Sequence, residues 1–363
     1  MDWLMIVSRH ILSQRGLSQR ASIALFSGIL LLASFFALPV TLFQFATAQA
    51  QSESFTALDK PASTAEQIVV GFFPINVYNL DIANNTYFVD AYAWFRWKGD
   101  INPTKTFEFV NAVDEWSLIK NFIEDEPIKL SDGSFYQALR IEGRFAQPFN
   151  LANFPLDQQQ LAIVIEDTTY TSNQIVYISD DADSGYGQSL KIPGWKILEW
   201  KQEALLHQYG SKFGDIDSNR SLPYAALRYQ LTIERPLSFF IWKLLLPLLI
   251  VISAHWCAFL LHPSMVDART AIPSTALLTL VFLQQSYSSS LPDVGYLVLI
   301  DKIYVIAYLL MILTLTKGIV TGIWAQAKTD DSYERIQRLD RKILFTEIGL
   351  FLVTVSWILL TRE

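Results

Sequence analysis

The last third of the chain contains three apolar runs that are each long enough to cross a membrane. They cover residues 237–261, 296–324 and 343–360, and about 20 mostly apolar residues span a hydrocarbon core of ~30 Å. A fourth segment, 268–290, has a helical period but carries Thr, Ser and Gln side chains. Because a polar helix is costly against lipid, this segment is expected to line water. Residues 237–363 therefore predict a four-helix transmembrane domain in a lipid bilayer.

Residues 51–236 have the opposite character, since they are polar and acidic. They hold 25 Asp and Glu residues against 15 Lys and Arg residues. Alternating apolar and polar positions recur in short runs, as in 87–97, 161–165 and 224–233, separated by Asn, Asp, Gly and Pro. This pattern predicts an all-β, immunoglobulin-like antiparallel sandwich. Cys257 is the only cysteine, so no disulfide within the chain can stabilise the sandwich, which must depend on core packing.

The N-terminus has the features of an export signal. Three arginines precede an apolar stretch at 21–45, and small residues follow at 46–48. We expect residues 1–50 to be a signal peptide. A retained membrane anchor is the alternative, because the apolar stretch is longer than most signal cores. Either arrangement places residues 51–236 outside the cytoplasm. The basic segment 328–342 then falls in the cytoplasm, which agrees with the positive-inside tendency.

Seven residues share one face of the polar helix. The steps between them are 4, 4, 3, 4, 3 and 4 residues, close to the helical repeat. From the inner to the outer end they are Asp267, Ala271, Thr275, Leu278, Phe282, Gln285 and Ser289. We expect this face to line a pore. The alternative is a helix whose polar residues only bond to neighbouring helices.

This face predicts a gate and an ion preference. Rings of Leu278 and Phe282 would form a narrow apolar constriction that loses water and blocks ions. Asp267 would place carboxylates at the cytoplasmic mouth, where they attract cations. Arg269 is offset from Asp267 by two residues, or about 200° around the helix. It is therefore expected to point away from the pore.

Three motifs occur in an order that resembles a known family. The sandwich contains Phe-Pro-Leu-Asp at 154–157, Glu-Arg-Pro at 234–236 opens the first span, and Leu-Pro at 291–292 follows the polar helix, with two further spans after it. Their order and spacing resemble the pentameric ligand-gated ion channels of the prokaryotic type, within the Cys-loop receptor superfamily. The two cysteines that close the Phe-Pro loop in animal members correspond here to Gln147 and Leu161. Prokaryotic relatives also lack that disulfide.

The resemblance implies a function and a set of partners. It implies a homopentameric channel without a cofactor, in the bacterial inner membrane with its N-terminal domain in the periplasm. A small agonist or protons would open it. The carboxylate of Asp267, on the face described above, would make monovalent cations the permeating ions. The resemblance assigns coupling between the domains to Asp81, Phe154, Pro155, Asp157, Arg235 and Pro292. Arg235, a fixed charge at a partly buried junction, needs a carboxylate, for which Asp157 and Asp81 are candidates. The alternative is that these residues only hold the two domains together.

The resemblance also implies an aromatic ligand site between subunits. The matching positions are Tyr92, Phe109, Tyr170, Tyr209 and Phe213. Such a box suits a cationic amine, although Thr168 replaces the tryptophan of animal acetylcholine receptors. Core packing is the alternative for each of the five. Protons are the competing stimulus, because acidic runs occur at 124–126 and 180–183, but runs of this kind are usually only solvated.

Other functional classes find little support in the sequence. No nucleophile motif or phosphate-binding glycine loop is present, and neither His255 nor His262 has a carboxylate at metal-ligand spacing. The net charge of −7 does not suit a nucleic-acid binder. We therefore expect no enzyme activity and no metal site. A non-conducting membrane receptor is the alternative to a channel.

Overall fold

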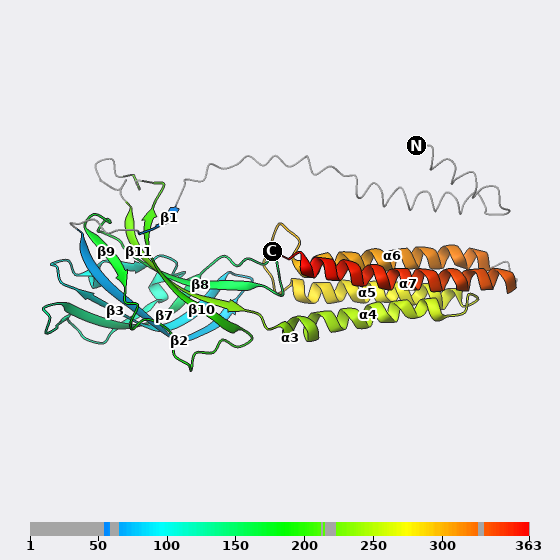
Figure 1. The fold of residues 1–363 in the computed structure, drawn as a ribbon, viewed down its shortest axis with the longest axis horizontal. Helices are drawn as coiled ribbons and strands as arrows, with labels where there is room; N and C mark the ends of the chain where they lie inside the picture. Colours follow the sequence, from blue (N-terminus) through cyan, green and yellow to red (C-terminus); the bar gives the residue numbers. More distant parts are fainter. Residues whose placement is uncertain (1–53, 59–64, 212, 215–222, 326–329, 363) are drawn as a thin grey trace.

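The computed structural model describes residues 54–58, 65–211, 213–214, 223–325 and 330–362. The predicted signal peptide at 1–50 lies outside these residues. Figure 1 shows a β-sandwich joined end to end with a bundle of long helices, and within the described residues the chain passes from the sandwich into the bundle at α3. The β-sandwich followed by four apolar helices confirms the predicted fold class.

The sandwich consists of two sheets. In the order of their pairing, the strands of the first sheet are β1 (Ser54–Ala57), β10 (Lys196–Gln208), β11 (Tyr224–Glu234), β8 (Gln158–Asp167) and β4 (Phe107–Phe109). The strands of the second are β5 (Ile119–Phe122), β7 (Phe135–Ala146), β3 (Thr86–Trp97), β2 (Glu66–Asp81) and β9 (Ile175–Ser179), with β6 (Ile128–Lys129) also paired to β7. The β2–β9 pair is parallel and the other pairs are antiparallel.

Aromatic residues fill the space between the two sheets. Phe72 of β2 stacks on Tyr229 of β11 with ring centroids 5.1 Å apart. The Tyr229 hydroxyl donates a 2.6 Å hydrogen bond to the carbonyl of Val70, and the Tyr87 hydroxyl donates to the carbonyl of Ala162 in the opposite sheet. Each buried ring contributes roughly 1.5–3 kcal/mol by leaving water, and the bonded hydroxyls avoid a burial penalty. Packing and cross-sheet hydrogen bonds thus hold the sandwich without a disulfide.

Four helical segments follow the sandwich. The first runs continuously over Leu237–Leu260 and is made of α3 (Leu237–Phe239), a π-helical segment (Phe240–Leu245), α4 (Leu246–Trp256) and a 3₁₀ turn (Cys257–Leu260). The others are α5 (Val266–Ser288), α6 (Leu299–Ala325) and α7 (Asp330–Leu360). All four are long and apolar enough to cross a membrane.

The fourth helix starts earlier than the apolar run. We expected a span at 343–360 after a cytoplasmic segment at 328–342, whereas α7 already begins at Asp330. Good helix formers occupy this stretch, and Glu334 pairs with Arg338 one turn later at 2.7 Å. Hydropathy alone misses the extra turns because they are charged. They matter because they bring Asp340 into the bundle.

Candidate functional site

The face of α5 predicted to line a pore is not covered by the other helices of this chain. All seven predicted pore residues are exposed, and Leu278 and Phe282 are 57% and 65% exposed. The opposite side of α5 is buried, with Leu280 and Tyr287 in the helix core. A polar face in this position needs either water or another copy of the chain beside it.

Hydroxyl groups along this face are bonded to the helix itself. Ser274 donates to the carbonyl of Thr270 at 2.8 Å, and Thr279 donates to the carbonyl of Thr275 at 2.9 Å. Because their protons are occupied, these side chains present oxygen lone pairs outward. Lone pairs suit water and cations better than anions.

The two charges at the start of α5 point to different sides. Asp267 is exposed, whereas Arg269 is buried and bonds Asp340 of α7. Pro273 lies inside the helix, which continues through it from Val266 to Ser288. The structure therefore separates Asp267 from Arg269 as the helical period predicts.

Arg235 joins the sandwich to the first helix. In the register of β11 with β8, Glu234 lies opposite Gln158, so Arg235 and Asp157 meet just beyond the paired strands. Arg235 Nε lies 2.9 Å from Asp157 Oδ1, and the Arg235 backbone N–H donates to the Asp157 carbonyl at 3.3 Å. Both side chains are largely buried.

Three aromatic rings surround the guanidinium of Arg235. They belong to Trp195, Phe154 and Phe239, at 4.2, 5.0 and 5.4 Å from Cζ. Burial lowers the pKa of Arg235, while the Asp157 carboxylate opposes that shift. An arginine nevertheless stays charged in a protein. The junction thus contains a fixed, buried cation that depends on one carboxylate.

Asp81 is not the ion-pair partner of Arg235. Its two oxygens accept hydrogen bonds from the backbone N–H and the side-chain amide of Asn84, at 3.1 and 2.7 Å, and these bonds lower its pKa. Asp81 therefore stabilises the turn between β2 and β3. It still lies close to the junction, because it lines a cavity of about 460 Å³ together with Phe154, Arg235 and Leu291.

The Phe-Pro loop contacts the start of α6. The N–H groups of Leu299 and Ile300 donate to the carbonyls of Ala152 and Phe154 at 3.0 and 3.2 Å. The first N–H groups of an α-helix have no hydrogen-bond partner within the helix. The Phe-Pro loop therefore supplies acceptors for two such groups of α6. Phe154 also stacks on Tyr287 of α5 at 6.4 Å. One loop of the sandwich therefore contacts both α5 and α6.

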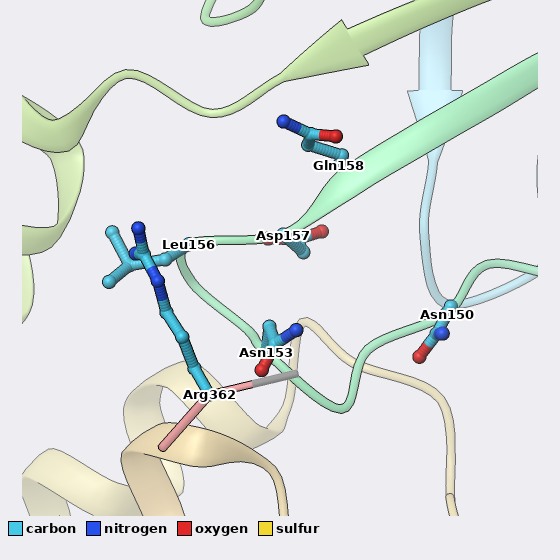
Figure 2. A pocket seen from close by; sticks show the side chains of 6 residues that line it. All are labelled: Asn150, Asn153, Leu156, Asp157, Gln158 and Arg362. Carbon is cyan, nitrogen blue, oxygen red and sulfur yellow. The ribbon is translucent and has the colours of Figure 1, made fainter. Parts of the chain in front are cut away.

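The remaining residues predicted to couple the two domains lie in the same region. Pro155 follows Phe154 through a cis peptide bond, and Pro292 lies in the segment after α5, next to the cavity residue Leu291. Figure 2 shows a second cavity, where Arg362, two residues beyond the end of α7, extends beside Leu156 of the Phe-Pro loop. The end of the fourth helix thus also reaches this loop.

Two of the five predicted ligand residues lie together at the end of β10. Tyr209 and Phe213 form an edge-to-face pair with centroids 5.2 Å apart, and Tyr224 packs on Tyr209 at 5.8 Å. Tyr170 follows β8, where its backbone N–H donates to Asp167 at 2.7 Å. Tyr92 lies on β3 of the other sheet and is partly exposed. Tyr92 thus lies on a different sheet of the sandwich from β10, the strand that Tyr209 directly follows.

Phe109 does not fit the predicted role. It is buried between the sheets and makes edge-to-face contacts with Phe107 and Phe145, at 5.6 and 5.8 Å. The alternation of β4 directs this ring inward. Phe109 is therefore a core residue, as the alternative interpretation predicts.

A buried carboxylate beneath Tyr209 was not among the predicted residues. Glu166 accepts a 2.9 Å hydrogen bond from the Tyr209 hydroxyl, and its other oxygen lies 2.5 Å from His207 Nδ1. Small Ala226 lies between the two strands that carry Glu166 and His207. The signal available in the sequence is the acidic pair Glu166-Asp167 that ends the apolar run 161–165.

Comparison with known proteins gives a consistent set of relatives. A gamma-aminobutyric acid receptor subunit beta of Lymnaea stagnalis is 25% identical over 201 residues, 54% of this chain and 38% of the relative. The corresponding subunit of Caenorhabditis elegans is 24% identical over 178 residues, 49% and 30% of the two chains. The subunit beta-4 of Gallus gallus is 27% identical over 170 residues, 47% and 33%.

These alignments cover about half of this chain but less than two fifths of each relative. No protein-family model matches the chain. Within the described residues, no group of three or more His, Cys, Asp or Glu side chains is placed to hold a metal ion.

Proposed function

We propose that this chain is the subunit of a homopentameric ligand-gated ion channel in the cell membrane. In this proposal residues 1–50 are a signal peptide, residues 51–236 bind the agonist in the periplasm of a bacterium, and residues 237–363 form the pore. The similarity to receptor subunits supports the class of protein. The observation that carries the proposal is the continuous exposed face of α5 from Asp267 to Ser289.

Ring assembly explains that exposed face. A lone subunit would turn Asp267 and Gln285 toward lipid, which is costly. A closed ring turns the same side chains toward a water-filled axis. Each subunit then contributes one copy of α5, and Leu278 and Phe282 form the apolar constriction that closes the pore.

The pore is proposed to prefer monovalent cations. Asp267 is the exposed charge at one end of the face, and the outward oxygen lone pairs near Ser274 and Thr279 suit a hydrated cation. The countercharge Arg269 is buried against α7. Asp267 therefore dominates the local potential.

The agonist site is proposed to recognise a cationic amine. Tyr209 and Phe213 offer ring faces for cation–π contact, and Glu166 supplies a carboxylate below Tyr209. Tyr92 of the neighbouring subunit would complete the site. The relatives are receptors for gamma-aminobutyric acid by name, so this amine is the first candidate. Protons are the second candidate, since the Glu166 carboxylate lies 2.5 Å from His207 Nδ1 and both side chains are buried.

Recording from the purified protein in planar bilayers tests the proposal. Gamma-aminobutyric acid, other primary amines and acidic solution are applied in turn to the side of the sandwich. We expect discrete cation currents that an amine or acid increases. Replacing Glu166 by Gln should weaken the response to an amine at least tenfold, because a buried polar site loses its countercharge. A protein that binds amines but never conducts would be a non-conducting receptor and would refute the proposal.

A further inference from the structure

Asp340 of α7 binds cationic side chains from two other helices. Its Oδ2 accepts a 2.6 Å hydrogen bond from the guanidinium of Arg269 in α5, and its Oδ1 forms an ion pair with the ammonium of Lys317 in α6. The side chains of Arg269 and Asp340 are only 4% and 1% exposed. One buried carboxylate therefore connects three helices at the level where α5 begins.

Close packing fixes the same part of α5 against α6. A Cβ added to Gly318 would lie 3.4 Å from the carbonyl oxygen of Arg269, and one added to Gly322 would lie 2.7 Å from a methyl group of Val266. Small residues four positions apart permit such an approach between helices. The glycines thus fix the position of the first turns of α5, and the ion cluster fixes their rotation.

That rotation determines which charge faces away from the bundle. Residues two positions apart lie about 200° apart around an α-helix. With Arg269 held against Asp340, Asp267 is on the exposed face. A released Arg269 would place a long cationic side chain at nearly the same level as the Asp267 carboxylate.

We propose that Asp340 is a selectivity-determining residue, because it keeps the Arg269 guanidinium out of the pore and leaves Asp267 as the charge that the permeating ion meets. This inference rests on the proposed pore function of α5. Asp340 acts through Arg269 and does not itself touch the ion, so it is a positioning residue.

The surrounding contacts indicate which cation would move if the carboxylate were lost. Lys317 lies over the ring of Phe259 at 4.2 Å and belongs to α6, away from the pore face. Glu347, two turns further along α7, is already bonded to Thr314 and Trp256. A buried cation without a countercharge is unstable. Of the two cations, Arg269 belongs to the pore-facing helix, so we expect Arg269 to turn toward water.

Reversal potentials in a sodium chloride gradient test this inference. The variants are Asp340→Asn, Arg269→Gln, the double variant, and Glu334→Gln as a matched control. Glu334 is an exposed carboxylate of the same helix that pairs with Arg338 one turn away. Asp340→Asn should lower the sodium-to-chloride permeability ratio about tenfold, the scale of a lost focusing charge. The double variant should restore the wild-type ratio, and Glu334→Gln should leave it unchanged.

The outcomes separate this inference from the proposed function. A wild type without current refutes the channel itself. If the wild type prefers cations, two results would refute the role of Asp340 alone. In the first, Asp340→Asn has the same permeability ratio as Glu334→Gln. In the second, the double variant has the same lowered ratio as Asp340→Asn. If Asp340→Asn alone passes no current, recovery of cation current in the double variant supports the inference, and continued silence overturns it.

Discussion

Replacing Asp157 by Asn removes the countercharge of a cation that cannot lose its proton. Arg235 keeps its three aromatic neighbours, but its guanidinium remains largely buried without a carboxylate. Breaking a buried ion pair by removing one partner costs about 3–5 kcal/mol. For a domain of this size each kcal/mol lowers the melting temperature by roughly 2–4 °C. Asp157→Asn is therefore expected to lower it by roughly 6–20 °C.

The chain offers a matched control one residue away. Lys196 and Glu234 form an ion pair of the same length, 2.9 Å, but both side chains are more exposed. Exposed pairs contribute about 0–1 kcal/mol, so Glu234→Gln should change the melting temperature by only a few degrees. Melting is followed by intrinsic fluorescence in detergent at a fixed scan rate, because unfolding of such a protein is usually irreversible. Equal shifts for the two variants would refute the buried-pair account.

Three further predictions concern assembly, the gate and acid stability. Native mass spectrometry in mild detergent should show five chains per particle, and a stable monomer would contradict the pore. Leu278→Thr should wet the constriction and produce leak current or higher agonist sensitivity; unchanged gating would place the constriction elsewhere. The bidentate bonds of Arg140 lower the pKa of Asp90, so this stabilisation is present above about pH 4, the ordinary Asp value. The stabilisation by this pair should decrease as the pH falls below that value. The melting temperature of Asp90→Asn should therefore fall less than that of the wild type over the same acidic range.

Local periodicity explains what could be predicted from the sequence. A 3.6-residue repeat depends only on spacing, so the exposed face of α5 and the opposite direction of Arg269 follow from the sequence alone. The change from a polar to an apolar composition at Arg235 likewise marks the boundary between the sandwich and the helices.

Contacts between distant residues explain what could not be predicted. Arg269 and Asp340 are 71 positions apart in the sequence. From the sequence, the charged stretch that contains Asp340 resembles a linker. Only the folded bundle shows that Asp340 pairs with Arg269 and Lys317. Glu166 and His207 are 41 positions apart on strands separated by β11. Phe109 has the right residue type for an aromatic site, but only the pairing of β4 with β8 shows that its ring faces the core.

The sign of the charge at the mouth of the pore is the central claim, and a reversal potential measures it directly. The wild type, Asp267→Asn and Arg269→Gln are compared in one salt gradient. Screening at physiological salt acts over ~8 Å, about the scale of a channel mouth, so a ring of carboxylates still acts on each passing ion. We predict a cation-selective wild type, a clear loss of conductance or cation preference in Asp267→Asn, and little change in Arg269→Gln, which leaves Lys317 and Asp340 as a neutral pair. An anion-selective wild type, or a larger effect from Arg269 than from Asp267, would contradict the account.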